Sequence, residues 1–436
     1  GALANAGQDA EALTHLLAYL ESAPDETATL NMTAVIYHRL GNDEEAVRYF
    51  TRAMKSAPQS RQPHLALAEM LRSHGDPDGA ARQEAAENDL PPEANAEYVV
   101  GVILMGEEKY DRAIEAFQKV LKLAPEDPLT HHVLAKSLEL SGDFDAAARH
   151  YAKALELDPD DPNRSLRLGT LLGKQKKYAE SIKYLRQCLE LDPANASARN
   201  NLAIAMAKLN NPKEAIEQLT ELLEDNPEDA LAHRNLADLL MDSGDVPGAA
   251  RHYAEAVRLK SEDQLALKGL GMTLARQGKF QEAYDTFTRV TELDPTDGRA
   301  WFGKGSMLEA QKKPKEAAAV YRKGLQSSPD DPLLLNAVAW HLATFYEAEA
   351  RNGAEAVRLA SAACKVTENK DPALLDTLAA AQAEAGLFDQ AVETARKAAE
   401  LASAAENEPF AKAIRERLEL YESHKPYHQA GPKPEK

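Results

Sequence analysis

Apolar residues recur along this 436-residue chain at the three- and four-residue spacing of amphipathic helices, in short segments separated by polar turns. One turn, "ELDPDDP" at residues 156–162, has close copies in "KLAPEDP" at 122–128 and "ELDPTD" at 292–297. Proline ends a helix because it lacks an N–H donor and clashes with the preceding turn, and the Asp or Asn that follows can cap the next helix. The pattern predicts an all-α chain made of many short helices.

The turns recur at a fixed period. Their prolines are Pro24, Pro58, Pro92, Pro125, Pro159, Pro193, Pro227, Pro295 and Pro329, with Ser261 in the equivalent place. Successive positions lie 34 residues apart, except for one step of 33 between Pro92 and Pro125. So regular a period over about 300 residues indicates an array of supersecondary units rather than a set of separate domains.

Other positions repeat in phase with the proline. Each unit carries a small residue in its first helix, such as Gly101, and a second small residue such as Ala113, and most units also carry a large one such as Phe117. Small residues let two helices approach closely while the large side chain fills the space beside them. The repeated unit is therefore predicted to be a packed pair of helices.

This combination of period and small, large and proline positions resembles the tetratricopeptide repeat family, over nearly the whole chain. The resemblance implies an all-α, right-handed superhelical α-solenoid of about eleven helix-turn-helix units with a C-terminal capping helix. It also implies that the first helix of each unit lines a concave groove, so its inward positions are candidates for partner contact.

The units are expected to be unequal. Glu84 stands where other units have a large apolar residue, and the chain begins within a helix, which suggests a fragment of a longer polypeptide. The closing repeats resemble those of large bacterial proteins of this family. We expect a partial first unit with a truncated first helix at 1–26, nine regular units at 27–329 with a looser joint near 84–94, two further units at 330–402 with an insertion at 344–353, a capping helix at 403–424 and a disordered tail at 425–436.

Charge and motif content narrow the function. The net charge of −19 argues against nucleic acid or an anionic membrane as a partner, because both would be repelled. No apolar run is long enough to span a bilayer, so we expect a soluble segment, cytoplasmic or periplasmic. Cys188 and Cys364 are predicted to be core residues, and the His131-His132 pair lacks a third ligand. No nucleophile, phosphate-loop or dinucleotide motif occurs, so we predict a non-catalytic protein with no cofactor and no metal.

The inward positions of the first helices give a strip rich in basic and amide side chains. Amides hydrogen-bond an extended peptide backbone, and Arg or Lys pair with acidic side chains or a C-terminal carboxylate. The family's carboxylate clamp is absent, because Lys268 has Met272 four residues on. Ordinary solvated polar residues remain the alternative interpretation. The predicted partner-binding residues are Arg167, Asn200, Asn201, Arg234, Asn235, Lys268, Arg299 and Phe302.

These features predict a scaffold that binds partner proteins or extended peptides in a concave groove. The alternative is a substrate- or partner-recruiting region of a larger enzyme, of hydrolase or glycosyltransferase type, whose catalytic domain lies before residue 1. A third hypothesis is homo-oligomerisation through the open N-terminal end of the array.

Overall fold

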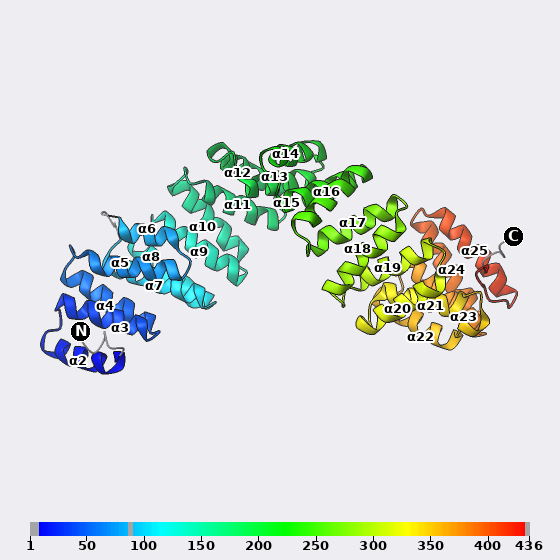
Figure 1. Ribbon diagram of the computed structural model, residues 1–436, viewed down its shortest axis with the longest axis horizontal. Helices are drawn as coiled ribbons and strands as arrows, with labels where there is room; N and C mark the ends of the chain where they lie inside the picture. Colours follow the sequence, from blue (N-terminus) through cyan, green and yellow to red (C-terminus); the bar gives the residue numbers. More distant parts are fainter. Residues whose placement is uncertain (1–7, 86–89, 432–436) are drawn as a thin grey trace. The chain divides into compact units, whose positions relative to one another are not determined.

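The protein is all-helical in the computed structural model, which describes residues 8–85 and 90–431 (Figure 1). These residues form 24 α-helices and one short 3₁₀ helix, and no strand occurs among them. The predicted fold class is confirmed. The chain divides into two compact units, Gly1–Gln218 and Leu219–Lys436, and the division falls within α14.

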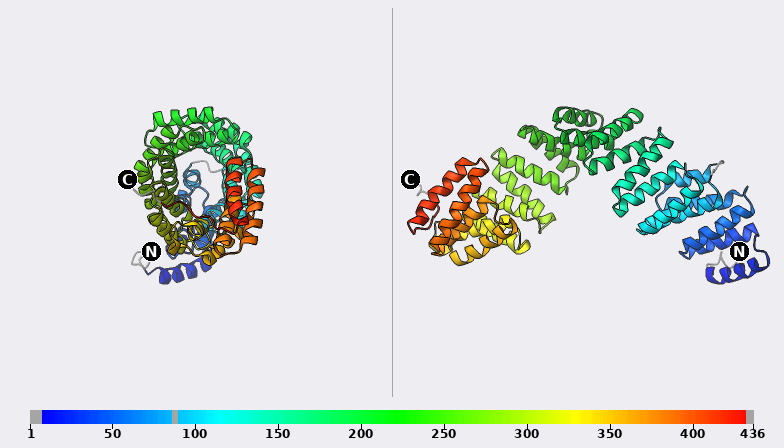
Figure 2. Two further views of the ribbon diagram at one scale, coloured as in Figure 1. Left: turned by 90° about the vertical axis from the view of Figure 1, so that its right-hand side faces the viewer. Right: turned by 180° about the vertical axis from the view of Figure 1, so that it is seen from behind.

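In each of the two compact units the helices pack in pairs. Each helix contacts chiefly the helix before it and the helix after it (Figure 2). The helices up to the division are α2 (Asp9–Ser22), α3 (Thr27–Arg39), α4 (Asp43–Ser56), α5 (Arg61–Ser73), α6 (Pro77–Glu84), α7 (Pro92–Gly106), α8 (Tyr110–Leu123), α9 (Pro128–Ser141), α10 (Phe144–Leu157), α11 (Pro162–Lys174), α12 (Tyr178–Leu191), α13 (Ala196–Lys208) and α14 (Pro212–Asp225).

The second unit continues the same pairing. Its helices are α15 (Ala230–Asp242), α16 (Val246–Leu259), α17 (Gln264–Arg276), α18 (Phe280–Leu293), α19 (Gly298–Ala310), α20 (Pro314–Ser327), α21 (Pro332–Thr344), η1 (Ala348–Ala350), α22 (Gly353–Val366), α23 (Pro372–Glu384), α24 (Phe388–Ala404) and α25 (Glu408–Glu422).

The repeated turn ends one helix and caps the next. After α10 ends at Leu157, the Asp161 side chain accepts a hydrogen bond from the backbone N–H of Asn163 (2.8 Å), at the start of α11. Pro162 occupies the first turn of α11, where its missing donor costs nothing. The turn therefore fixes where each first helix begins.

Close approach between the two helices of a pair depends on the small residue of the first helix. A Cβ added to Gly101 of α7 would lie 2.6 Å from a ring carbon of Phe117 on α8. Both residues are buried, and Phe117 is fully inaccessible to solvent. The same relation joins the pairs Gly169 and Leu185, Gly271 and Phe287, and Gly305 and Tyr321.

The third helix pair departs from the others. Its second helix, α6, has eight residues, whereas α4 and α8 have fourteen each. With α6 this short, α7 packs against α4 of the preceding pair. Residues 86–89, which belong to the expected looser joint, lie outside the described residues, as do residues 1–7 of the expected truncated helix.

The last helix covers the apolar face of α24. Ile414 and Tyr421 of α25 are fully buried and belong to the same apolar cluster as Ala395 and Ala402 of α24. This is how a capping helix ends an array of repeats, since an uncovered helix pair would expose apolar surface.

The segment after α25 differs from the sequence-based prediction of disorder from residue 425. Residues 425–431 lie against the preceding repeats, and the Gln429 backbone N–H donates to the Thr344 carbonyl at the end of α21 (2.7 Å). The prediction rested on the general tendency of chain termini to be poorly ordered, whereas the Tyr427 ring packs near Trp340. Residues 432–436 lie outside the described part of the chain.

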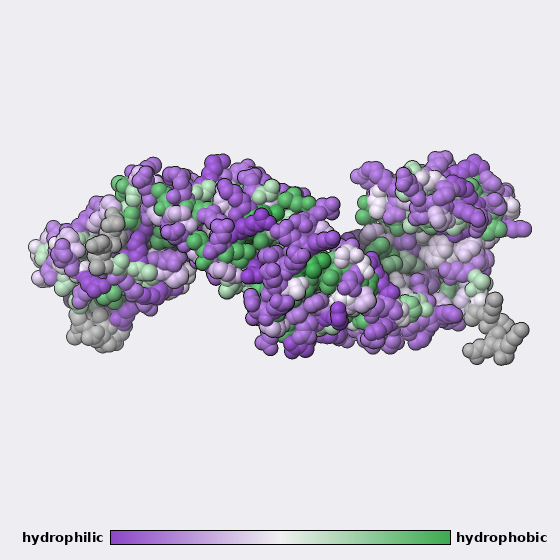
Figure 3. Space-filling view, turned by 90° about the horizontal axis from the view of Figure 1, so that it is seen from above, coloured by the Kyte–Doolittle hydropathy of each residue, from purple (hydrophilic) through white to green (hydrophobic). Residues whose placement is uncertain are grey.

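The surface is mostly polar. Figure 3 shows one face on which hydrophilic residues predominate and hydrophobic residues gather in separate patches between them. No helix in the described ranges combines the length and the apolar character that a membrane crossing requires.

Replacing Gly101 with Ala should destabilise the protein, because the new methyl group would overlap the Phe117 ring. Overpacking of this kind costs about 1–3 kcal/mol, which exceeds the gain of up to about 1 kcal/mol in helix propensity. Urea unfolding followed by circular dichroism measures the loss. Gly106→Ala is the matched control on the same helix, because its nearest neighbour would be 3.4 Å away. Equal effects of the two substitutions would contradict the packing argument.

Candidate functional site

The eight predicted partner-binding residues lie on first helices of their pairs, in two groups. Arg167 is on α11, and Asn200 and Asn201 are on α13, all in the first unit. Arg234 and Asn235 on α15, Lys268 on α17, and Arg299 and Phe302 on α19 belong to the second unit. Each group is a separate candidate surface.

The amide side chains mostly serve contacts within the repeats. Asn200 is 3% exposed, and its Nδ2 donates to the Ala196 carbonyl (3.1 Å). Asn201 Nδ2 donates to Thr170 Oγ1 of the preceding first helix (2.9 Å). Asn235 is buried as well. Asn201 therefore links two neighbouring first helices, and the buried Asn200 and Asn235 offer little surface to a partner.

The cations of the second unit are also engaged. Arg234 Nη1 lies 2.9 Å from Asp263 Oδ2, and Lys268 Nζ lies 2.8 Å from Asp297 Oδ2. Asp263 and Asp297 are the N-cap residues of α17 and α19, so each cation bridges to the cap of the following repeat. Their charges are therefore largely compensated.

The last two predicted residues of the second unit are more accessible. Arg299 is exposed, and no ion pair involves it within the described residues. Phe302 is half-buried and stacks on Tyr321, with ring centroids 5.8 Å apart. They form a small mixed surface on α19.

In the first unit, Arg167 borders a pocket of about 460 Å³. We call it the Arg167 pocket. Its walls come from the turn before α6, from α9 and from the first turns of α11. The titratable lining residues are Asp76, Asp78, His132, Lys136, Asp161, Arg164 and Arg167.

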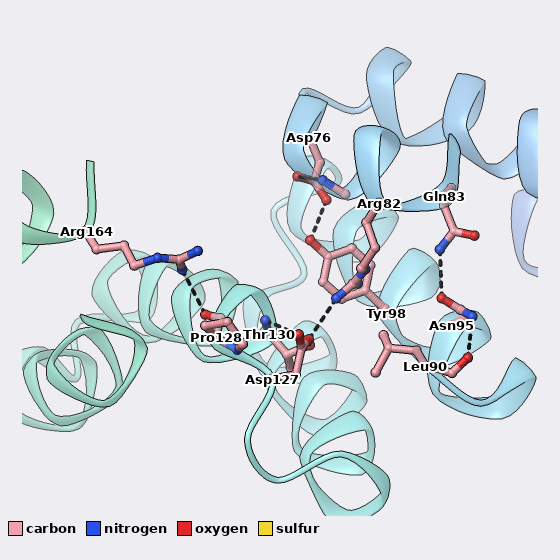
Figure 4. Close-up of polar contacts among 11 residues, drawn as sticks. Asp76, Arg82, Gln83, Leu90, Asn95, Tyr98, Asp127, Pro128, Thr130 and Arg164 are labelled. Carbon is pink, nitrogen blue, oxygen red and sulfur yellow. Dashed lines mark hydrogen bonds and ion pairs between the residues drawn. The ribbon is translucent and has the colours of Figure 1, made fainter. Parts of the chain in front are cut away.

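One wall of the Arg167 pocket is acidic. Asp76 and Asp78 lie at the start of α6, and burial together with the charges of Asp76 and Asp161 raises the pKa of Asp78. Arg164 is 7% exposed and compensates Asp161, because its Nε lies 3.3 Å from Asp161 Oδ2. Arg164 also donates to the Pro128 carbonyl (3.1 Å) (Figure 4).

The opposite wall is basic. Lys136 of α9 is half-buried and Arg167 of α11 is exposed, and neither has an ion-pair partner in the described ranges. His132 of α9 lines the same pocket, and its Nδ1 is buried without a hydrogen-bond partner among the described residues. Burial, with the nearby charges of Arg164 and Arg167, lowers the pKa of His132 to about 4. Because the His132 imidazole is neutral, the positive charge of this wall comes from Lys136 and Arg167, and neither of them is compensated by an ion pair within the described part of the chain.

A polar network fixes the short helix α6 beside this pocket (Figure 4). The Tyr98 hydroxyl donates to Asp76 Oδ2 (2.7 Å), and burial raises the pKa of Tyr98 well above its usual value, so it keeps its proton. The Arg82 guanidinium carbon lies 4.1 Å from the Tyr98 ring centroid, and its Nη1 donates to Asp127 (2.8 Å). Asp127 also caps α9 by accepting from Thr130 N (3.1 Å). These contacts position the acidic wall.

Sequence reasoning singled out Arg167 and passed over the rest of the pocket. A signal for His132 was present, because it occupies the same position in the 34-residue period as Asn200 and Arg234. The 33-residue step marks the irregular repeat. Nothing in the sequence shows that Asp76 and Arg167 lie on one pocket.

The adjacent histidines have packing roles. His131 Nε2 donates to the Pro125 carbonyl (3.0 Å), and its Nδ1 lies 2.9 Å from His150 Nδ1. No group of three or more potential metal ligands occurs among the described residues. Cys188 and Cys364 are buried with free thiols, and burial raises the pKa of both, to about 11 for Cys364. High thiol pKa values disfavour the reactive thiolate.

Replacing Arg234 or Lys268 with Met should lower the free energy of unfolding, because Asp263 or Asp297 would lose its charged partner while remaining mostly buried. The expected loss is about 1–2 kcal/mol, since each aspartate keeps backbone N–H partners. Urea unfolding measures it. Arg299→Met is the control on an exposed cation and should leave stability unchanged. Equal stability of all three variants would contradict a structural role for the ion pairs.

Stability should fall as the pH drops from about 7 to about 5. The unfolded chain protonates His132 near its ordinary pKa of about 6.5, whereas the folded chain resists protonation until pH about 4. His132 alone therefore contributes a loss of about 2 kcal/mol over this range. Burial lowers the pKa of His150 and His252 as well, with the same sign. Urea unfolding at the two pH values should show a smaller loss for His132→Gln; an identical loss would contradict the assignment.

Comparison with known proteins agrees with the helix pairs. Models described as tetratricopeptide repeat match residues 2–61, 39–93, 104–164, 171–239, 230–255 and 268–332. None of the curated proteins compared with the chain matches it.

Several solved structures share the repeat. A tetratricopeptide repeat protein from Parabacteroides merdae is 15% identical, with a TM-score of 0.44, over 56% of this chain and 97% of that one. PilW, a type IV pilus biogenesis factor, is 18% identical, with a TM-score of 0.43, over 48% and 96%. YrrB, described as having an unusual peptide-binding site, is 24% identical, with a TM-score of 0.32, over 51% and 98%. The family matches span more than half of the chain, and the chain belongs to the tetratricopeptide repeat family.

Proposed function

We propose that the protein is a non-catalytic scaffold that binds an extended segment of a partner protein at the Arg167 pocket. The observation that carries the proposal is the pair of uncompensated cations, Lys136 and Arg167, on one wall of a pocket about 460 Å³ in volume. Cations without an internal partner are available to an anionic group of a ligand, and Arg can bind a carboxylate through two parallel hydrogen bonds.

The pocket also limits the kind of partner. The acidic wall at Asp76 and Asp78 repels a second carboxylate and attracts a basic side chain, so the ligand is an extended segment with an acidic group near a basic or neutral polar one. The neutral His132 can accept or donate one hydrogen bond through its unpartnered Nδ1. Mixed charge in the ligand complements the two walls.

The mixed surface formed by Arg299 and Phe302 in the second unit is a separate contact region in this proposal. An exposed guanidinium beside a stacked ring suits an aromatic or acidic side chain. Recruitment to an assembly and recruitment to an enzyme domain would both begin with this binding step.

Random peptides displayed on phage and selected on the whole chain should become enriched in Asp and Glu. A synthetic peptide from that selection should bind Arg167→Glu about tenfold more weakly than the unmodified chain, because the carboxylate would meet a negative charge. Added salt should also weaken binding. Fluorescence anisotropy measures both effects.

The matched control for that experiment is Arg149→Glu on α10, an exposed cation outside the pocket. It makes the same charge change in the same unit and should leave the affinity unaltered. If both variants bind the selected peptides equally well, the Arg167 pocket is not the binding site.

A further inference from the structure

Residues 425–431, which we call the C-terminal segment, cross the ends of two first helices in the second unit. The His428 Nε2 lies 2.7 Å from Glu384 Oε2, at the last residue of α23. The Gln429 backbone N–H donates to the carbonyl of Thr344, the last residue of α21 (2.7 Å). Carbonyls in the last turn of a helix lack intrahelical partners, so this acceptor is available to any extended chain that passes.

The Tyr427 ring occupies a preformed aromatic and cationic cluster. It lies 6.0 Å from the Trp340 ring, and the Arg417 guanidinium is 5.6 Å from Tyr427 and 5.7 Å from Trp340, measured to ring centroids. Arg417 is held by Asp376 through two hydrogen bonds of 3.0 and 2.7 Å. The receiving side of the cluster is therefore fixed by residues of α21, α23 and α25, independently of Tyr427.

The groups that contact the C-terminal segment complement the chemistry of its successive residues. Glu384 is also held in place, because Arg351 Nε lies 2.9 Å from its Oε1. A ring site, a carboxylate and a backbone acceptor thus follow one another along the ends of α25, α23 and α21, and they receive Tyr427, His428 and the backbone of Gln429.

Beyond these contacts the surface continues into a pocket of about 530 Å³. It is lined by Glu309, Lys312, Pro314, Trp340, His341 and Tyr346 and by residues 429–431 of the C-terminal segment. His341 is 4% exposed, its Nε2 lies 3.0 Å from Glu309, and its Nδ1 has no hydrogen-bond partner among the described residues. The C-terminal segment therefore borders a cavity with an unsatisfied polar group.

We propose that the C-terminal segment is an intramolecular ligand that occupies a second peptide-binding surface, made by Trp340, Thr344, Glu384 and Arg417. The partner that fits this surface is an extended peptide with an aromatic residue followed directly by His or a basic residue. Such a peptide binds when the segment leaves. The inference shares the general peptide-binding role proposed above, but it uses different residues from the Arg167 pocket.

The segment is held weakly enough to exchange. Its backbone makes one hydrogen bond to α21 and one to Leu420 of α25, Tyr427 contacts the Trp340 ring and the Arg417 guanidinium, His428 pairs with Glu384, and Lys425, Ala430 and Gly431 are exposed. Segments with few buried contacts open locally at low free-energy cost. Tethering nevertheless gives the segment an effective concentration in the millimolar range, so it excludes weak external peptides.

The test uses a fluorescein-labelled peptide of sequence KPYHQAG, which copies residues 425–431. It should bind the full chain carrying Tyr427→Ala and His428→Ala about tenfold more tightly than the unmodified chain, because the surface is vacated. A peptide with Ala in place of Tyr and His should not bind. Equal affinity for the two chains, or no binding to either, would overturn the proposal.

Two further variants locate the contact in the vacated chain. Glu384→Gln should weaken peptide binding, whereas Glu393→Gln, an exposed carboxylate on α24, should not. In a Trp301→Phe background, where Trp340 is the remaining tryptophan, vacating the surface should increase acrylamide quenching and the peptide should reverse it.

Light scattering distinguishes a second copy of the chain as the occupant. A dimer that dissociates when Tyr427 and His428 are replaced would show that the segment binds in trans, which would overturn the intramolecular assignment. Failure of KPYHQAG to bind leaves the Arg167 pocket untouched, because peptides selected on that pocket are tested with Arg167→Glu.

Discussion

An aspartate stands at the start of seven described first helices, α9, α11, α15, α17, α19, α21 and α23, and much of this structure depends on its interactions. It caps the helix, and in several repeats it also receives a cation, as when Asp263 receives Arg234 and Asp297 receives Lys268. Because this aspartate recurs in most repeats, a cation at the position of Arg234 or Lys268 on the preceding first helix has a carboxylate within reach. The repeated turn therefore has two effects. It sets where a first helix begins, and its aspartate compensates the positive charge of a cation on the preceding first helix.

This charge compensation distinguishes the cations that form ion pairs within the array from the cations that remain available to a partner. Arg167 and Lys136 escape it, and both line the pocket beside the irregular third pair. In a regular pair, the second helix is long enough to pack on the next first helix, as α8 packs on α9. The short α6 cannot do this, and polar contacts among Asp76, Tyr98 and Arg82 replace the missing apolar packing. In this irregular pair, the charged side chains of Asp76 and Arg82 therefore contact Tyr98 of the next first helix.

Most of the fold could be predicted from the sequence, because a 34-residue period and a small residue opposite a large one are direct consequences of helix geometry. Gly101 and Phe117 show the point, since the recurrence of this small and large pair in successive repeats predicts the helix contact that the structure has. The site was harder. Position in the repeat gives the face on which Arg234 lies, but not that Asp263 neutralises it. The ordered position of Tyr427 could not be predicted for the same reason, because its ring contact depends on where Trp340 lies in space.

The charge balance explains how an acidic chain could still bind an acidic partner. A net charge of −19 repels anions at long range, but at physiological ionic strength fields decay over about 8 Å, so a ligand near the surface responds mainly to its nearest neighbours. At the basic wall of the Arg167 pocket those neighbours are Lys136 and Arg167, with His132 kept neutral. Under the proposed function, distant repulsion would slow encounter with acidic proteins in general, while the local cations would retain a segment that presents its carboxylate at the right place. Acidic surroundings would therefore favour selectivity over affinity. Only a ligand that contacts both cations gains enough electrostatic attraction to offset the long-range repulsion.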